Sequence, residues 1–373
     1  MKIVAIETRR IRQSAELWYA PHMPPSGARD FEFPLTTITT DSGIEGHTMD
    51  YGPLGQGRAS AYALHDIYYH DLLGANPLHT EEIWQRLRSK QRHLYNFRET
   101  IWSNLDVALW DIKGRVAGMS IAALLGQYRD RIPTYATCPP QTIGTLEELK
   151  QQVLEKKAQG YAGIKLQLSG GPAADIPRLR LARELVGTDY PLMLDSSAAL
   201  SFDTALKIGH VLDELHYEWF EEPVPDAQIL QLRKLAAELR TPILAAETVG
   251  LAELPQYMLD GATDLIRADV HHKGGVTGLW KALGMCELLG FELEIHTASS
   301  PLLDAANLQV GCATRLSRYI ESHHPMFRFG LKGNPLGLRD GCQHLPTGPG
   351  LGVELDWDWL DNHTVEALRG DCL

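Results

Sequence analysis

The sequence predicts an α/β fold, a closed (β/α) barrel preceded by a smaller α+β module. From about residue 132 onward, strand-like apolar runs alternate with amphipathic helical stretches, which is typical of repeated βα units. Three of these runs lead into acidic residues at equal intervals of 26 positions, namely Asp195, Glu221 and Glu247. That interval holds one strand, one helix and two loops, so the repeats place three carboxylates at the same rim of a parallel barrel.

The first module, residues 1 to about 127, lacks this βα rhythm. Residues 1–7 alternate like a strand, and two loops rich in glycine and proline cover 21–27 and 51–57 before helical patterns take over. After residue 347 the chain is rich in turn residues and then becomes strand-like. We therefore expect the C-terminal segment to return and pair with the first module.

The helices of the repeating part carry clear start and stop signals. Thr145 and Glu148 form a capping box, Leu149 and Val153 share one helical face, and Gly160 supplies a left-handed stop before the next strand. Further helices are predicted at 202–215, 227–239 and 277–289.

Eight strand ends can be counted in the repeating part, and a closed barrel needs eight. They fall at 134–138, 164–167, Asp195, Glu221, Glu247, Asp269, His296 and Glu321. The last six end in an ionisable residue, and the carboxyl ends of barrel strands form the active-site face. We therefore expect these six side chains to face one opening.

Composition excludes several classes of function. The chain has 373 residues, 44% of them hydrophobic, and a net charge of −12 without blocks of basic residues, which argues against binding nucleic acid or an anionic membrane. Its five cysteines are widely spaced and indicate neither a disulfide framework nor a zinc site. Because no signal-peptide core and no apolar run of about 18 residues occurs, we expect a cytoplasmic protein that binds a small molecule.

Several segments resemble the enolase superfamily and, within it, the mandelate racemase subgroup. They are residues 105–114 with 124–126, 221–225, Asp269 with 273–278, and 348–353. The resemblance covers essentially the whole chain and implies a barrel of the modified TIM type at 128–347. It also implies an α+β capping domain over that barrel, formed by 1–127 and completed by 348–373.

The resemblance implies that Asp195, Glu221 and Glu247 bind Mg²⁺ at the ends of the third, fourth and fifth barrel strands. Ligands that are all oxygen suit a hard divalent cation. Glu222 competes with Glu221 for this role, because the two are adjacent and only one can point into the barrel. His271 and His272 are left out of the predicted metal set, since such a cation does not need imidazole ligands.

The predicted metal site defines a reaction class, the removal of a proton α to a carboxylate, because a divalent cation stabilises the resulting enediolate. His296 is the predicted general base, and Asp269 is placed to hold its other ring nitrogen, similar to the His/Asp dyad of the subgroup. Lys165 matches a family lysine that contacts the substrate carboxylate. Glu321 matches a family position that hydrogen-bonds this carboxylate when protonated.

The second strand departs from the family pattern, which has Lys-x-Lys where this chain has Lys165 and Gln167. A neutral amide cannot accept a proton at useful pH, so a two-base racemisation is not favoured. With one base, the expected reaction is syn dehydration of a sugar acid to a 2-keto-3-deoxy acid, with His296 acting as base and then as acid.

Substrate contacts are predicted from Gln167 and from residues of the two N-terminal loops. The loop candidates are His22, Arg29 and Tyr51, with Arg58 just beyond. Two alternatives remain open: a racemase or epimerase of a 2-hydroxy acid, with Lys165 as the second base, and a relative that binds a ligand without turning it over. By analogy with the subgroup we expect a homo-oligomer.

Overall fold

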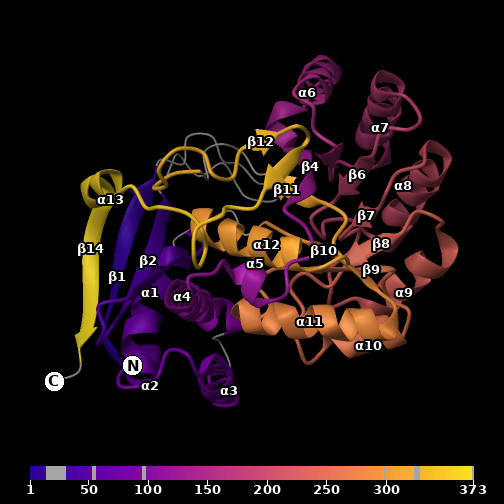
Figure 1. Cartoon of the computed structure of the whole chain (residues 1–373). Helices are drawn as coiled ribbons and strands as arrows, with labels where there is room; N and C mark the ends of the chain where they lie inside the picture. Colours follow the sequence, from indigo (N-terminus) through magenta and orange to yellow (C-terminus); the bar gives the residue numbers. More distant parts are fainter. Residues whose placement is uncertain (14–30, 53–55, 95–97, 298–299, 323–327, 372–373) are drawn as a thin grey trace.

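The computed structural model describes residues 1–13, 31–52, 56–94, 98–297, 300–322 and 328–371. Two sheets organise these residues (Figure 1). The larger sheet contains eight consecutive parallel strands, β4 to β11, and the pairing of β11 with β4 closes them into a barrel. The predicted fold class is therefore confirmed.

The barrel strands match the predicted strand ends closely. They are β4 (Arg131–Cys138), β5 (Gly163–Gln167), β6 (Leu192–Asp195), β7 (Phe220–Glu221), β8 (Ile243–Ala245), β9 (Leu265–Ala268), β10 (Glu292–Ile295) and β11 (Ile320–Ser322). The hairpin of β12 (Leu338–Arg339) and β13 (Cys342–His344) pairs antiparallel with β4.

Helices follow the barrel strands and surround them. They are α6 (Leu146–Ala158), α7 (Pro172–Val186), α8 (Phe202–Leu215), α9 (Ile229–Glu238), α10 (Leu254–Leu259), α11 (Gly275–Leu289) and α12 (Pro301–Ala313), with a 3₁₀ turn at Pro140–Thr142. The capping box of Thr145 and Glu148 forms as predicted, and the helix predicted at 202–215 has those bounds. The helices predicted at 227–239 and 277–289 are found within two residues of their predicted ends.

The smaller sheet combines the beginning and the end of the described chain. Its order is β14 (Thr364–Asp371), β1 (Ile3–Gln13), β2 (Phe31–Thr40) and β3 (Glu45–Met49), all antiparallel. The helices of this part are α1 (Gln56–Ala63), a π-helical turn (Leu64–Tyr68), α2 (Tyr69–Leu72), α3 (Thr80–Lys90), α4 (Glu99–Ala117) and α5 (Ile121–Leu124), with α13 (Trp357–His363) before β14. Of these, α1 and α4 pack against strands of the sheet, and α3 packs on α4. The boundaries of the two predicted domains remain a proposal.

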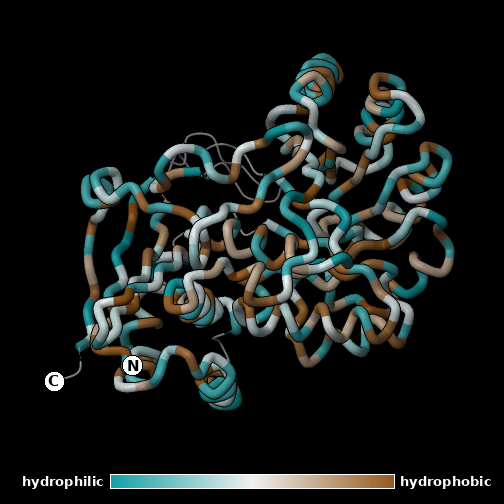
Figure 2. Tube along the Cα trace, viewed as in Figure 1, coloured by the Kyte–Doolittle hydropathy of each residue, from teal (hydrophilic) through white to brown (hydrophobic). Residues whose placement is uncertain are grey.

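Residues inside the barrel alternate with residues that face the surrounding helices. Met193, Trp219 and Leu244 belong to a small buried cluster separate from the main core, as expected for barrel-filling side chains. Asp195 follows Met193 by two positions and Glu221 follows Trp219 by two, so each carboxylate points to the same side as the filling residue before it. In Figure 2 the mostly hydrophilic helices α3 and α6 lie at the periphery.

Two of the segments that carry the family resemblance touch each other. A side chain at Gly114 of α4 would put its Cβ 2.5 Å from the Cα of Gly350, so only glycine permits this approach. Asp111, also on α4, accepts hydrogen bonds from Leu351 N at 2.9 Å and from His47 N at 3.0 Å. The end of the chain is thereby fixed against the first module.

Asp106 of α4 joins the first module to the barrel helix α11. It accepts hydrogen bonds from Thr277 N at 2.8 Å and from Thr277 Oγ1 at 2.7 Å, at the positive end of the helix. Burial nevertheless raises the pKa of Asp106 from 3.8 to about 7. A buried carboxyl at this contact makes its stability depend on pH.

We expect Asp106→Asn to change the pH dependence of stability. Because the folded pKa is raised, the folded state binds the proton more tightly, and this contribution is full below pH 3.8 and is lost as the pH rises to about 7. Wild type should therefore lose about 2–3 kcal/mol between pH 5 and 7 relative to the variant. Urea unfolding at both pH values measures this, with the exposed Asp260→Asn as control. Parallel pH profiles would contradict the assignment.

Among the described helices, none is both long enough and apolar enough to cross a bilayer.

Candidate active site at the carboxyl ends of the barrel strands

The predicted carboxylates of the third and fourth strands lie side by side. Asp195 pairs in register with Glu221 on one side and with Gln167 on the other. Glu221 is buried and accepts a hydrogen bond from Trp219 Nε1 at 3.2 Å, whereas Asp195 accepts one from Ser197 N at 2.7 Å. Of the adjacent pair, Glu221 is the residue that points into the barrel.

Lys165 lies at the centre of a buried cluster of charges. Its Nζ is 3.3 Å from Asp195 Oδ2, 3.1 Å from Glu221 Oε2 and 3.1 Å from Glu321 Oε1. Burial alone would lower the pKa of Lys165, but Glu221 and Glu321 raise it well above its usual value. Lys165 is therefore a charged ammonium group that three carboxylates share.

Arg267 is a second buried cation that the sequence analysis missed. Its Nη2 donates to Glu321 at 2.6 Å and to the Tyr135 hydroxyl at 2.9 Å. Its Nε lies 2.9 Å from Glu221 Oε1 as an ion pair that lacks hydrogen-bond alignment. The signal was present, because Arg267 lies on β9 two positions before Asp269, which directly follows that strand, and side chains two positions apart point to the same side of a sheet.

Four donors from the described part of the chain surround Glu321. In addition to Lys165 and Arg267, the Tyr135 hydroxyl donates at 3.1 Å, and Thr137 makes a short hydrogen bond to the other oxygen. Donors of this kind stabilise a carboxylate that only accepts. The predicted role of a protonated Glu321 that donates to substrate therefore receives no support from these contacts.

The predicted dyad forms. His296 Nδ1 lies 2.8 Å from Asp269 Oδ2, and its Nε2 is 3.7 Å from Glu247 Oε2. Burial would raise the pKa of Asp269, but contacts with His272 and His296 hold it well below its usual value. Burial would lower the pKa of His296, but Glu247 and Asp269 raise it to about 9.

His272 also contacts the dyad, which sequence reasoning did not foresee. Its Nδ1 lies 3.1 Å from both oxygens of Asp269, and its backbone N donates to Oδ1 at 2.6 Å. Asp269 thus holds two imidazoles. The neighbouring His271 is turned away from them, with its Nδ1 3.2 Å from Asp50 Oδ1.

A clamped turn presents Glu247. Asp226 accepts hydrogen bonds from Ala246 N at 2.9 Å and from Thr248 N at 3.0 Å. From the other side, Lys273 Nζ donates to three carbonyls of the turn, including that of Glu247 at 2.7 Å. Ala246 has φ of 75°, a left-handed conformation that costs free energy in a residue other than glycine.

Such strain concentrates at these strand ends. Among the described residues, six other than glycine have positive φ, and four of them lie within three positions of a predicted metal ligand: Ser197, Ala198, Glu222 and Ala246. The surrounding hydrogen bonds must hold these conformations, as is common at functional sites.

The three predicted metal ligands do not form a closed group in this structure. Among the described residues, the set whose ligand atoms lie within 4.8 Å of one another is Glu247, His272 and His296. Asp195 and Glu221 are instead drawn to Lys165, and Glu247 is drawn to His296. The three carboxylates are apart because each forms an ion pair with a neighbouring basic side chain, Lys165 for Asp195 and Glu221 and His296 for Glu247.

The predicted substrate contacts are only partly placed. Gln167 Nε2 donates to Ser197 Oγ at 2.9 Å, beside Asp195. Tyr51 packs against His271 with ring centroids 5.9 Å apart, and burial and the charge of Glu247 raise its pKa. Arg58 is exposed and lies over the Tyr62 ring. His22 and Arg29 fall outside the described residues.

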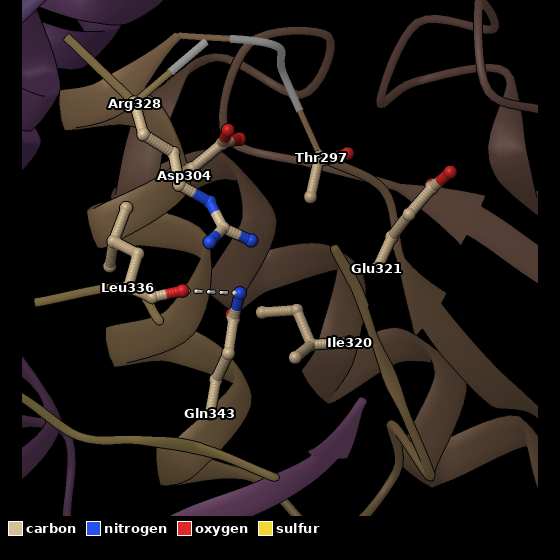
Figure 3. A pocket seen from close by; sticks show the side chains of 7 residues that line it. All are labelled: Thr297, Asp304, Ile320, Glu321, Arg328, Leu336 and Gln343. Carbon is tan, nitrogen blue, oxygen red and sulfur yellow. Dashed lines mark hydrogen bonds between the residues drawn. The ribbon is translucent and has the colours of Figure 1, made fainter. Parts of the chain in front are cut away.

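A polar pocket adjoins the rim at the eighth strand (Figure 3). Its lining includes Thr297, Asp304, Glu321, Arg328 and Gln343. Arg328 is held by a hydrogen bond of 2.6 Å to Ser322 on β11. Of the predicted site residues that the structure describes, only Glu321 lines this pocket, so the pocket extends the site rather than containing it.

The closed barrel with acidic side chains at its strand ends, and the antiparallel sheet formed from both ends of the described chain, define the class of protein. The chain belongs to the enolase superfamily. A family model described as enolase C-terminal domain-like matches residues 148–359, and the N-terminal domain model of mandelate racemase / muconate lactonizing enzyme matches 7–126.

The individual proteins that this chain resembles share less than a third of its residues, and their activities differ from one another. D-galactarolactone cycloisomerase of Agrobacterium fabrum is 29% identical over 344 residues, covering 87% of this chain and 89% of that protein. L-talarate/galactarate dehydratase of Salmonella typhimurium is 29% identical over 329 residues, covering 86% and 80%. The structure of D-glucarate dehydratase from Agrobacterium tumefaciens complexed with magnesium has a TM-score of 0.88 at 27% identity, covering 98% of this chain and 100% of that one.

Proposed function

We propose that this chain removes the proton α to a carboxylate in a Mg²⁺-dependent reaction and eliminates water from a sugar acid, leaving a 2-keto-3-deoxy acid. One observation carries this proposal: Asp269 holds the imidazole of His296 beside Glu247, while an amide, Gln167, occupies the place of a second base.

Asp195, Glu221 and Glu247 are the residues that would hold the cation. Their donors are all carboxylate oxygens, which suit Mg²⁺. Negative charge is also concentrated at this rim. Together with burial, repulsion from Glu247, Asp226 and Asp195 raises the pKa of Glu222 well above its usual value. When bound, Mg²⁺ supplies positive charge that stabilises the enediolate.

The remaining chemistry belongs to His296. In the neutral form of His296, Nε2 accepts the α-proton, while Asp269 accepts a hydrogen bond from Nδ1 and stabilises the resulting imidazolium. Although burial lowers the pKa of His296, Glu247 and Asp269 raise it to about 9, so this neutral form gains population as the pH rises toward that value. The imidazolium then returns the proton to the β-hydroxyl on the same face as the C–O bond breaks, which releases water and leaves an enol. The enol becomes the 2-keto acid by tautomerisation.

The racemase alternative needs a second base, and neither Gln167 nor Lys165 meets that requirement. Gln167 donates its amide to Ser197 and has no basic lone pair on nitrogen. Lys165 is a charged ammonium group paired with three carboxylates, so it has no lone pair either. Neither group supports proton transfer on the opposite face.

A cycloisomerase is the second candidate, favoured by the 29% identity to D-galactarolactone cycloisomerase over 87% of this chain. The same α-proton abstraction could expel the ring oxygen of a lactone in place of a hydroxyl group. The ring would open and the product would be an isomer of the substrate.

Mass spectrometry of products distinguishes these candidates. The protein is incubated with Mg²⁺ and a library of aldonic acids, aldaric acids and their lactones in D₂O. Dehydration gives a product lighter by one water, whereas ring opening gives an isomer. Deuterium at the α-carbon with inversion and without water loss would contradict the proposal in favour of racemisation, and tight binding without turnover would favour a non-catalytic relative.

We expect Asp226→Asn to weaken Mg²⁺ binding about 10- to 100-fold, the usual effect of losing a residue that orients a metal ligand. The amide cannot accept both backbone hydrogen bonds of the turn that presents Glu247. Calorimetric titration with Mg²⁺ measures the affinity, and the exposed Asp203→Asn serves as control. Unchanged Mg²⁺ affinity would separate this turn from metal binding.

A further inference from the structure

We infer that Gln167 and Ser197 act together as positioning residues for Asp195, one of the three carboxylates that would hold Mg²⁺. The inference rests on the proposed function and gives Gln167 a task other than substrate contact. Gln167 Nε2 donates a hydrogen bond to Ser197 Oγ at 2.9 Å, and Ser197 Oγ donates in turn to Asp195 Oδ1 at 3.3 Å. The three side chains therefore form a chain of hydrogen bonds that ends on a proposed metal ligand.

Strand register brings Gln167 beside Asp195. The two residues are partners across the neighbouring parallel strands β5 and β6. Lys165, two positions before Gln167 on β5, points into the barrel, where its Nζ lies 3.1 Å from Glu221 Oε2. Because side chains two positions apart share one side of a strand, Gln167 also lies on the inner side, and its amide reaches the turn that follows β6.

This turn fixes one oxygen of the buried Asp195. The backbone N of Ser197 donates to Oδ1 at 2.7 Å, and the Ser197 hydroxyl bonds the same oxygen. Ser197 makes both contacts with φ of 48°, a left-handed conformation that costs free energy in a residue other than glycine. The second oxygen, Oδ2, lies 3.3 Å from Lys165 Nζ, in the buried cluster of charges. The turn thus determines which oxygen of Asp195 faces the centre of the barrel.

The main chain of the turn is held from both sides. Ser196 N donates to the carbonyl of Glu221 at 3.1 Å, and Ala198 N donates to the carbonyl of Glu222 at 2.8 Å. On the side of β5, Ser196 Oγ donates to the carbonyl of Leu168 at 3.0 Å. None of these bonds involves Gln167, so its replacement should leave the backbone of the turn in place.

The hydroxyl proton of Ser197 is what Gln167 controls. A serine hydroxyl carries one proton and can also accept hydrogen bonds. When the Gln167 amide donates to Ser197 Oγ, that proton is directed away from the amide and toward Asp195 Oδ1. Outer-shell hydrogen bonds of this kind orient metal ligands. Gln167 therefore acts on the cation through two intervening side chains.

The test measures Mg²⁺ affinity by calorimetric titration of wild type, Gln167→Met, Ser197→Ala and the double variant. Methionine matches the length of glutamine without its donor, and alanine removes only the hydroxyl. We expect a loss of about tenfold in Ser197→Ala, as for other outer-shell residues, and of about three- to tenfold in Gln167→Met, as for one neutral hydrogen bond. The double variant should lose no more than Ser197→Ala, because the two residues act as one unit. The exposed Gln127→Met should bind like wild type.

Kinetics at saturating Mg²⁺ separate positioning from substrate contact. If Gln167 acts through Asp195, both single variants should show the wild-type KM for the acid once the ion saturates the site. A KM raised in Gln167→Met and not in Ser197→Ala would place Gln167 on the substrate and overturn the inference. Unchanged Mg²⁺ affinity in Gln167→Met, or additive losses in the double variant, would also overturn it while the proposed function stands. Failure of wild type to bind Mg²⁺ would overturn both.

Discussion

Replacing His296 by asparagine should lower turnover of the proposed sugar-acid substrate by about 10²–10⁴-fold, the contribution of a positioned general base. The amide approximates the shape of the ring but cannot accept a proton. It can still donate a hydrogen bond toward Asp269, so folding should be preserved. The measurement is kcat at saturating Mg²⁺, together with the rate of α-proton exchange in D₂O.

The exchange rate tests the mechanism more sharply than turnover alone. If His296 is the only base, His296→Asn should lose α-proton exchange as fully as it loses dehydration. His210→Asn, an exposed histidine on α8, controls for the substitution itself. Exchange that persists in the His296 variant would show that another group removes the proton.

Replacing Arg267 by methionine should destabilise the protein by about 3–5 kcal/mol, the typical cost of removing one partner from a buried ion pair. Arg267 is completely buried and contacts Glu221, Glu321 and the Tyr135 hydroxyl. Without it, Lys165 is the one lysine or arginine of the described residues that still pairs with these two buried carboxylates. Urea unfolding gives the change in free energy.

Two further variants make the Arg267 prediction specific. The double variant Arg267→Met/Glu321→Gln also removes the negative charge of Glu321, which would otherwise stay buried without Arg267. It should therefore recover part of the free energy of unfolding that Arg267→Met loses. Arg315→Met, which breaks an exposed ion pair with Glu287, should change stability by less than about 1 kcal/mol. Equal losses at Arg267 and Arg315 would contradict the buried-network interpretation.

The barrel could be predicted because its signals are local. Each βα repeat carries its own apolar run, cap and stop, and equal spacing of Asp195, Glu221 and Glu247 sets the repeat length. The contact between Asp269 and His296 followed as well, since adjacent parallel strands bring their ends together. Alternation along β7 also explains why Glu221, after Trp219, points inward.

The partners of individual side chains could not be predicted. Strand periodicity places Arg267 inside the barrel but does not say that it contacts both Glu221 and Glu321 across it. His272 reaches Asp269 because of the turn after β9, and its distance from Glu247 depends on the left-handed residue Ala246. Such contacts arise from loop conformations that no repeat pattern encodes.

The sheet shared by the two ends of the chain constrains the order of events during synthesis. Strand β1 leaves the ribosome before the other described strands, yet its neighbour β14 is made more than 350 residues later. Until then one edge of β1 has no partner, whereas the barrel strands pair with near neighbours and close much shorter loops. Nascent chains stalled before residue 364 should thus carry a protease-resistant barrel and a protease-sensitive beginning.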